Sequence, residues 1–438
     1  MRIKKIILKN YRNYDNLELE FNDNLNIIIG DNAQGKTNLL ESIYVLAVTK
    51  SFLSISDRGL IKFDNRFSII KGILENNNST DDLEILFGDN GKIVRINNKE
   101  IKKLSDYISK MNVVIFSTDN IRMFREGPSN RRKYFNVQIS QINRKYLKTL
   151  NDYNIILRQR NEFLKVVNLN KKSDTDYLDV LDNKYVDLSL AIYNFRNEYV
   201  KSINNYLDDM FYSITNLRGL RLEFISNIND SRDLLIGKLK KNINKELQYK
   251  MTLIGPNRDD FCFYLNNKNL ALYGSQGQMR SAVLALKMAE VMLFTEEACD
   301  SPILLLDDMF SELDINKRNN ILRYLSSDVQ TIITTTDIEN VSKDIRKNAN
   351  VYKIENGKIK RADIRWYSNG EISNHNGAAR ILITENKTKK EYYIDGNPVK
   401  NELQIAVMKK IGNKYERKLV SRIRKLIKKE NEVSNEVI

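Results

Sequence analysis

The segment Leu25-Asn26-Ile27-Ile28-Ile29-Gly30-Asp31-Asn32-Ala33-Gln34-Gly35-Lys36-Thr37-Asn38 contains an apolar run that stops at a glycine and is followed by Lys-Thr. This GxxxxGK[ST] pattern predicts a strand, a phosphate-binding loop and a helix, in that order. Gly30 and Gly35 let the backbone turn so that successive N–H groups point at phosphate oxygens. The loop ends where the following helix presents the positive end of its dipole. The segment therefore predicts a triphosphate site.

The residue types in this loop indicate the role of each position. We expect Lys36 to reach the terminal phosphates of a nucleotide, and Thr37 to give its hydroxyl to a magnesium ion that bridges phosphate oxygens. Apolar residues follow at helical spacing, which favours this interpretation over a glycine-rich turn with a solvated lysine. The other loop residues expected to bind the nucleotide are Gly30, Asp31, Asn32, Ala33, Gln34 and Gly35.

The composition is that of a soluble globular protein of 438 residues, with 42% hydrophobic and 29% charged residues. The absence of a long apolar run or signal core predicts a cytoplasmic protein with no membrane partner. Cys262, Cys299 and the one histidine, His375, are too scattered for a disulfide framework or a zinc site. The net charge of +15 favours a polyanionic partner such as nucleic acid, although a Lys- and Asn-rich coding bias raises the same number.

The apolar periodicity divides the chain into an α/β fold with an insertion. Strand-like patterns dominate up to residue 128, whereas apolar residues recur at helical spacing from Ser129 through residue 164 and again over 177–214. We predict a mixed-sheet phosphate-loop fold interrupted by a mainly helical segment. The predicted parts are 1–128 (N-terminal part with the phosphate loop), 129–250 (mainly helical insertion), 251–361 (C-terminal part) and 362–438 (basic α+β extension), and the family resemblance given below implies that 1–128 and 251–361 together form an ATPase head.

Two further segments extend the predicted nucleotide site. Ser275-Gln276-Gly277-Gln278 precedes an apolar helix, and a serine and a glycine at a helix start favour an anion. The buried run 302–306 ends in Asp307 and Asp308, which is costly unless the carboxylates meet a cation. We expect Asp307 to hold Mg²⁺ directly or through water, and Asp308 to orient or deprotonate the attacking water. The alternative is a strand followed by a capping aspartate.

These segments closely resemble the RecF family of DNA replication and repair proteins, which are relatives of the SMC ATPases. The resemblance covers residues 1–361 and rests on segments 30–38, 255–260, 275–280 and 307–314. It implies an ABC-type head in which two chains sandwich ATP between the phosphate loop of one chain and Ser275-Gln276-Gly277-Gln278 of the other. It also implies that segment 311–314 crosses the dimer interface and that Arg12 and Asn13 contact the nucleotide.

The resemblance further implies an ATP-dependent DNA-binding protein of replication, recombinational repair and the DNA-damage (SOS) response. Such a protein forms an ATP-dependent homodimer on single- or double-stranded DNA at gaps or junctions. It assists recombinase loading with recombination mediator proteins and hydrolyses ATP slowly, stimulated by DNA. The wider ABC superfamily usually has glutamate where Asp308 stands, and the shorter carboxylate suits slow turnover. Thr335 or Thr336 is expected at the position of the switch histidine of other ABC ATPases.

Two residues depart from the RecF pattern without touching the expected triphosphate clamp. Asn257 stands where the family commonly has histidine, and Leu53 stands where it commonly has arginine. Two other function classes compete, namely a transporter nucleotide-binding subunit and a structural SMC-like protein. The large helical insertion between Thr37 and Ser275 disfavours the first class, and the lack of long heptad arrays or a CxxC hook disfavours the second.

The DNA-contacting residues are open at this stage. Arg131-Arg132-Lys133 is one candidate, but a solvated helix face explains this basic segment equally well. In the extension, strands are predicted over 380–384 and 391–394 and a basic amphipathic helix over 401–429. That helix could bind DNA, dock on a partner, or cover the head with a charged outer face.

Overall fold

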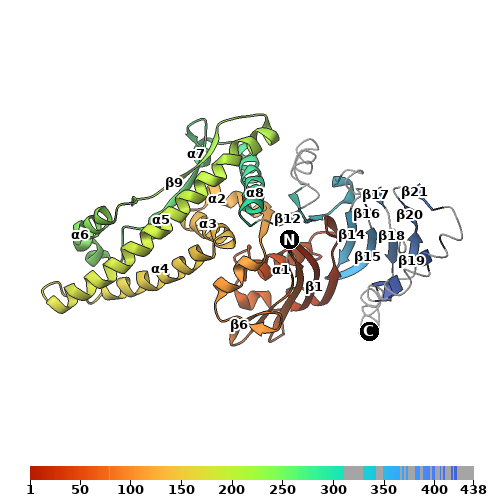
Figure 1. Ribbon diagram of the computed structural model, residues 1–438, viewed down its shortest axis with the longest axis horizontal. Helices are drawn as coiled ribbons and strands as arrows, with labels where there is room; N and C mark the ends of the chain where they lie inside the picture. Colours follow the sequence, from red (N-terminus) through yellow and green to blue (C-terminus); the bar gives the residue numbers. More distant parts are fainter. Residues whose placement is uncertain are drawn as a thin grey trace. The chain divides into compact units, whose positions relative to one another are not determined.

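The computed structural model describes most of the chain. The described residues are 1–309 without 78 and 299, 329–341, 349–365, 367–368, 371–372, 380–384, 388–394, 397–399, 405, 408–409, 416–417 and 419–421. The chain folds into two compact units (Figure 1). The first unit comprises Met1–Tyr107, Met111–Thr118 and Asp300–Ile438, and the second comprises Ile108–Lys110 and Asp119–Cys299.

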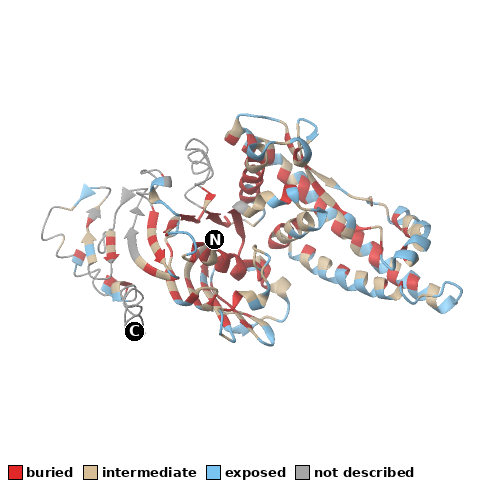
Figure 2. Ribbon diagram, turned by 180° about the vertical axis from the view of Figure 1, so that it is seen from behind, coloured by how far each residue is buried: buried red, intermediate tan, exposed pale blue. Residues whose placement is uncertain are grey.

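The central sheet of the first unit has eight strands in the order β19-β18-β15-β14-β3-β13-β12-β8. Strands β14, β3, β13, β12 and β8 pair in parallel, and β12, β13 and β8 are buried along their whole length at the centre of this unit (Figure 2). Near-continuous apolar runs are expected for parallel strands covered on both faces. The bounds are β3 Leu25–Ile29, β8 Val113–Ser117, β12 Ile303–Asp307, β13 Thr331–Thr335, β14 Ala349–Glu355 and β15 Lys358–Arg365. The helix after β3 is α1, Lys36–Val48.

A second, antiparallel sheet completes the first unit, with six strands in the order β2-β1-β4-β5-β6-β7. The predicted N-terminal ribbon is confirmed, because β1 and β2 form a hairpin whose turn is Arg12-Asn13. The predicted turn at Asn97-Asn98 is also present, with both residues in the left-handed region. The bounds are β1 Arg2–Tyr11, β2 Tyr14–Glu20, β4 Ser68–Glu75, β5 Thr80–Gly88, β6 Gly91–Ile96 and β7 Lys99–Glu100.

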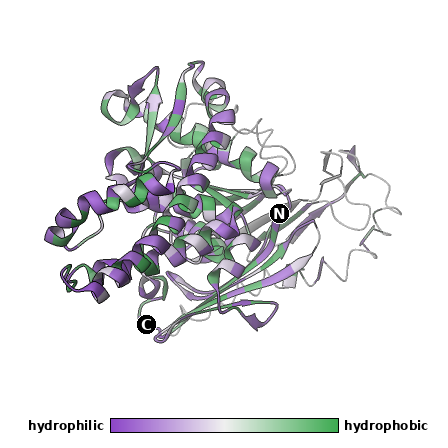
Figure 3. Ribbon diagram, turned by 60° about the vertical axis from the view of Figure 1, so that its left-hand side comes forward, coloured by the Kyte–Doolittle hydropathy of each residue, from purple (hydrophilic) through white to green (hydrophobic). Residues whose placement is uncertain are grey.

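The second unit is mainly helical, as predicted for the insertion. Its long helices α4 and α5 pack against each other, and hydrophilic and hydrophobic stretches alternate along the helices (Figure 3). The helices are α2 Arg122–Arg125, α3 Pro128–Ile142, α4 Arg144–Phe163, α5 Lys172–Thr215, α6 Arg232–Tyr249, α7 Leu270–Tyr273 and α8 Gln276–Ala298. A three-stranded sheet contains β9 Leu220–Ile225, β10 Asp260–Leu265 and β11 Lys268–Asn269. Short 3-10 helices of the second unit are η3 Ile108–Lys110, η4 Thr118–Ile121 (whose first residue belongs to the first unit) and η5 Pro256–Arg258, and those of the first unit are η1 Asp57–Leu60, η2 Leu104–Asp106 and η7 Ile338–Asn340.

The position of α8 differs from the division predicted from the sequence. The predicted part 251–361 grouped α8 with the ATPase head, whereas α8 belongs to the helical second unit. Lys287 on α8 is fully buried, lies 3.3 Å from Glu290 and donates to the Tyr134 hydroxyl of α3 at 2.6 Å. Tyr199 of α5 donates to the same Glu290 at 3.3 Å. Because buried charges need partners, these contacts tie α8 to the arm helices.

The C-terminal extension adds strands to the central sheet. Strand β18, Arg380–Thr384, pairs with β15, and β19, Thr388–Glu391, pairs with β18. Two small ribbons pair β16 Tyr367–Ser368 with β17 Glu371–Ile372, and β20 Tyr393–Ile394 with β21 Asn397–Pro398. The strand predicted over 380–384 is confirmed, and 391–394 falls partly in β19 and β20. Most of the helix predicted over 401–429 lies outside the described residues.

We expect Ile383→Ala to lower the free energy of unfolding by about 2–5 kcal/mol, because the Ile383 side chain is fully buried in this added strand. Urea unfolding measures the change. Lys389→Ala on β19 is the control: its side chain is 70% exposed and its ion pair with Glu391 should contribute at most about 1 kcal/mol. Equal stability of the parent and Ile383→Ala would contradict the pairing of β18 with β15.

Candidate functional site

The predicted phosphate loop connects β3 to α1. Ala33 and Gly35 have left-handed backbones, with φ of 65° and 109°. Helix α1 begins at Lys36 with Gly35 as its N-cap, no side chain caps it, and no acidic residue lies in its first turn. The N–H groups at the start of α1 are therefore available to an anion.

The β1–β2 turn supports this loop from one side. Asn13 donates its amide to the Gln34 carbonyl at 3.2 Å, and the Tyr14 hydroxyl donates to the Gly35 carbonyl at 2.8 Å. Asn38 donates to the Asn13 side-chain oxygen at 2.8 Å. A Cβ at Gly35 would lie 2.5 Å from the Asn13 Nδ2 atom, so this close approach requires glycine. Asn13 thus fixes the shape of the loop, and its direct contact with a nucleotide stays a prediction.

The turn between β14 and β15 supports the loop from a distant part of the sequence. Gly357 donates its N–H to the Gln34 carbonyl at 2.9 Å, and the Asn356 N–H donates to Gln34 Oε1 at 2.5 Å. A Cβ at Gly30 would overlap the carbonyl oxygen of Ile354. Gln34 is therefore held by two hairpin turns at once, a role that its position in the loop pattern did not indicate.

Lys36 extends back along the loop. Its Nζ atom donates to the carbonyls of Gly30 and Asp31, both at 2.8 Å. Burial lowers the pKa of Lys36, and the carboxylates of Asp308, Asp307 and Asp31 oppose that shift. A terminal phosphate in the loop would offer this ammonium a charged acceptor in place of neutral carbonyls, which makes a stronger hydrogen bond.

Thr37 and Asp307 are brought together at the end of β12. The Thr37 hydroxyl donates to Asp307 Oδ1 at 3.0 Å, and the Thr334 hydroxyl donates to the same atom at 2.8 Å. Burial raises the pKa of Asp307, although both hydroxyls and Lys36 act against that shift. A hydroxyl and a buried carboxylate are ligands that Mg²⁺ accepts beside phosphate oxygens and water, so this pair fits the predicted ion.

Thr334 is the site residue that the sequence interpretation missed. It faces Asp307 in the register of β12 and β13, and its Oγ1 also accepts the Asp308 N–H at 3.0 Å. Asp308 has a left-handed backbone, with φ of 48°, which a non-glycine residue adopts at a cost. Thr335 instead donates to the Asp337 carbonyl at 3.0 Å. The sequence could have indicated Thr334, because a polar residue inside a buried strand needs a hydrogen-bonding partner.

Two further predicted positions are the second switch candidate, Thr336, and the interface segment 311–314. Thr336 is exposed just after β13. The interface segment 311–314 lies outside the described residues. Roles for these positions stay predictions.

The segment Ser275-Gln276-Gly277-Gln278 opens α8 in the second unit. Gln278 Oε1 accepts the Ser275 N–H at 2.9 Å, and Ser275 Oγ accepts the Gln278 N–H at 3.2 Å. This reciprocal pair is a capping box, and Ser275, Gln276 and Gly277 are exposed. The cap explains why a serine starts this helix, and the predicted contact with a nucleotide stays a prediction.

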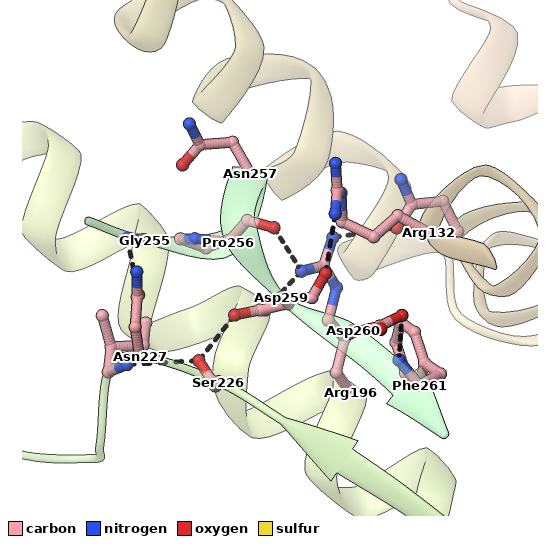
Figure 4. Close-up of polar contacts among 12 residues, drawn as sticks. Arg132, Arg196, Ser226, Asn227, Gly255, Pro256, Asn257, Asp259, Asp260 and Phe261 are labelled. Carbon is pink, nitrogen blue, oxygen red and sulfur yellow. Dashed lines mark hydrogen bonds and ion pairs between the residues drawn. The ribbon is translucent and has the colours of Figure 1, made fainter. Parts of the chain in front are cut away.

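The loop of residues 255–260 organises the second unit (Figure 4). Arg196 lies 2.5 Å from the Asp259 carboxylate and also donates to the Pro256 carbonyl at 2.8 Å, both in the interior. Ser226 donates to Asp259 at 2.5 Å, and Arg132 donates to the Asp259 carbonyl at 2.7 Å. Burial raises the pKa of Asp259, whereas the charge of Arg196 lowers it. Removing either ionic partner would leave a buried charge, so these residues act mainly in packing.

We expect Asp307→Asn to be at least as stable as the parent without nucleotide at neutral pH. Because burial raises the pKa of Asp307, ionisation costs more in the folded chain than in the unfolded one, and asparagine removes that cost while keeping Oδ1 as an acceptor. The difference should vanish below the ordinary carboxyl pKa of about 4, where Asp307 is protonated in both states. The added stability from Mg²⁺ in the presence of ATP should be lost.

Urea unfolding at two pH values, with and without Mg-ATP, measures these effects. Asp64→Asn, at an exposed position of the same unit, is the control. A nucleotide-free Asp307→Asn variant less stable than the parent by more than about 1 kcal/mol would contradict the burial cost.

Comparisons with known proteins agree on one family. The family model described as "RecF/RecN/SMC N terminal domain" matches residues 2–360. The DNA replication and repair protein RecF of Listeria welshimeri is 35% identical over 370 residues, which cover 83% of this chain and 100% of that protein. The RecF protein of Staphylococcus haemolyticus is 37% identical over 369 residues, covering 82% and 100%.

The fold is also that of solved structures from this family. One, described as "Structure of the recombination mediator protein RecF-ATP in RecFOR pathway", is 34% identical with a TM-score of 0.75, over 82% of this chain and 96% of that chain. In the part of this chain that the structure describes, no helix has the length and apolarity needed to span a membrane. The chain therefore belongs to the RecF family of DNA replication and repair proteins, and its fold is the ABC-type ATPase head of the RecF and SMC proteins with a helical insertion.

Proposed function

We propose that this protein binds Mg-ATP and, in that state, dimerises on DNA during replication and recombinational repair. The observation that supports this most directly is the arrangement of Lys36, Thr37 and Asp307 around one loop in a RecF-family chain. Relatives of this chain are described as RecF bound to ATP and as a recombination mediator protein. Recombinase loading with mediator proteins is part of the same proposal.

The chain's own residues would divide the chemistry of ATP among them. Lys36 would hold the terminal phosphates, and Thr37 with Asp307 would hold Mg²⁺, which neutralises charge on the phosphate oxygens. Asp308 follows the metal ligand and would orient or deprotonate the attacking water. Its left-handed backbone is an unusual conformation of the kind that active sites retain. Hydrolysis would be slow and would act as a switch.

A second copy of the chain would complete each nucleotide site through Ser275-Gln276-Gly277-Gln278. Leu272 and Tyr273 immediately precede this segment, and they are 74% and 73% exposed. Large apolar side chains at the surface favour a contact that covers them. This exposure beside Ser275 supports an interface with a second copy.

DNA would be held through its phosphates, since the chain carries a net charge of +15. The three residues of the candidate segment 131–133 differ in how far they are free to contact a DNA phosphate. Arg131 makes paired hydrogen bonds to the Asp260 carboxylate at 2.7 and 2.8 Å, so its charge is already matched. Arg132 is engaged with a backbone carbonyl, whereas Lys133 is exposed. Lys133 is therefore the best phosphate contact of the three.

Lys36→Ala and Ser275→Arg should separate nucleotide binding from dimerisation. Lys36→Ala removes a charged donor to the phosphates, so the affinity for ATP should fall by about tenfold or more while the fold survives. Ser275→Arg should bind ATP normally but stay monomeric, because it places bulk and charge in the interface. Calorimetry measures ATP affinity, sedimentation velocity measures the oligomer, and Lys268→Ala at an exposed position is the control. Unchanged ATP affinity in Lys36→Ala would refute the loop assignment, and a Ser275→Arg dimer would refute the sandwich.

DNA affinity should fall linearly with salt on a log–log plot, with a slope of about −0.9 per phosphate neutralised. Lys133→Gln should make the slope shallower by about one contact, whereas Lys268→Gln on β11 should leave it unchanged. Titrations of single-stranded, duplex and gapped DNA with and without ATP provide the measurement. A salt-independent affinity would exclude the phosphate mechanism, and an unchanged slope for Lys133→Gln would exclude that contact.

A further inference from the structure

Glu41 is a buried carboxylate that the proposed chemistry does not use. It lies on α1 after Lys36 and Thr37, and its side chain is 0% exposed. An ionised carboxylate in the interior needs charged or hydrogen-bonding partners. Because Glu41 lies on the helix that starts at the phosphate loop, its partners are connected to that loop through α1.

Three side chains converge on Glu41 from separate segments. The Tyr11 hydroxyl donates to Oε2 at 3.0 Å, the Arg12 Nε atom lies 3.1 Å from Oε2, and the Ser51 hydroxyl donates to Oε1 at 2.5 Å. Burial and the charge of Glu41 both raise the pKa of Tyr11, which keeps that phenol a neutral donor. Glu41 therefore joins the end of β1, the β1–β2 turn and the segment after α1.

The Arg12 guanidinium is held on two of its three nitrogens. Besides the ion pair of Nε with Glu41, Nη1 donates to the Gly59 carbonyl at 3.1 Å. The Arg12 backbone is left-handed, with φ of 53°, and its N–H donates to the Leu60 carbonyl at 3.0 Å. Nη2 makes no hydrogen bond among the residues that the structure describes, and the side chain is 24% exposed. A guanidinium held in this way presents its remaining N–H groups in one fixed direction.

The location of this guanidinium connects it with the phosphate loop. The next two residues, Asn13 and Tyr14, donate to the carbonyls of Gln34 and Gly35. The turn that carries Arg12 is therefore fastened to the loop by adjacent residues. Arginine is the side chain best suited to a phosphate, because its planar N–H groups match phosphate oxygens.

We propose that Glu41 is a positioning residue that holds Arg12 for a phosphate group of the bound nucleotide. The inference rests on the proposed binding of ATP at the loop. Glu41 fixes the Nε side of the guanidinium, Gly59 fixes Nη1, and Nη2 is left to the ligand. Ser51 donates to the second oxygen of Glu41 and so helps to hold that carboxylate in place.

A double-mutant cycle tests the proposal. Glu41→Gln keeps the shape of the side chain but loses its charge, and Arg12→Gln removes the guanidinium. Each should weaken Mg-ATP binding by about tenfold, the size expected for one charge-assisted hydrogen bond. The double variant should bind no more weakly than Arg12→Gln alone, because Glu41 acts only through Arg12. Calorimetry gives the affinities, and urea unfolding without nucleotide reports on stability.

Three outcomes would overturn the proposal: additive losses in the double variant, unchanged affinity in Glu41→Gln, or unchanged affinity in Arg12→Gln. ATP binding by the parent and by Lys36→Ala tests the proposed function separately. If the parent does not bind ATP, or if Lys36→Ala binds it as tightly as the parent, the proposed function fails, whereas the outcomes above concern Glu41 and Arg12 alone. If Glu41→Gln does not fold, Ser51→Ala replaces it in the cycle, because Ser51 donates to Glu41. It should weaken ATP binding in the parent by about two- to threefold and not at all in Arg12→Gln. An equal loss in both backgrounds would contradict the inference.

Discussion

The phosphate loop depends on hydrogen bonds to its own backbone from segments far away in the sequence. Ala33 and Gly35 have left-handed backbones, and the surrounding structure must hold such a conformation in place. The Gln34 carbonyl accepts hydrogen bonds from Asn13 on one hairpin turn and from Gly357 on another. The glycines at positions 30 and 35 permit this close approach, because a Cβ at Gly30 would overlap the Ile354 carbonyl of β14 and a Cβ at Gly35 would overlap the Asn13 side chain. The conformation of the phosphate loop thus depends on several distant segments of the first unit.

Buried ion pairs are the second recurring constraint, and each joins segments that the apolar pattern alone would leave loosely specified. The Glu41–Arg12 pair joins the β1–β2 turn to α1, and the Arg196–Asp259 pair joins α5 to the 255–260 loop. Lys287 and Glu290 both lie on α8, and this pair joins α8 to the arm helices through the hydroxyls of Tyr134 and Tyr199. Such pairs contribute little net stability, because desolvation offsets most of the attraction. Removing one partner of such a pair is strongly destabilising, since it leaves an unpaired charge in the interior, whereas replacing both partners with apolar residues is often neutral. They therefore fix the geometry of both units more than they stabilise them.

The sequence predicted what local periodicity and motif spacing encode. The strand and helix around the phosphate loop and the long arm helices follow from short patterns and are present in the structure. Thr37 and Asp307, predicted as ligands of one magnesium ion, are hydrogen-bonded to each other, and their binding of the ion stays a prediction. Helix α8 lies in the second unit, and the sequence did not indicate this because the apolar face of α8 is equally compatible with a sheet or with helices as its partner. Thr334 was missed for a related reason. A strand pattern shows which residues share a face, but it does not show which residue stands opposite in the neighbouring strand.

The extension shows how an addition at the edge of a sheet can act on a distant loop. Strand β18 pairs with β15 over residues 361–365, and the other end of β15 begins at the turn that donates to Gln34. The β14–β15 hairpin is thus held at one end by the added strands and bound at its turn to the phosphate loop. Because an edge strand without a partner is more mobile than a paired one, β18 restrains the hairpin as a whole. Residues beyond the family match therefore extend the sheet that supports the phosphate loop, and the β14–β15 hairpin connects the added strands with that loop.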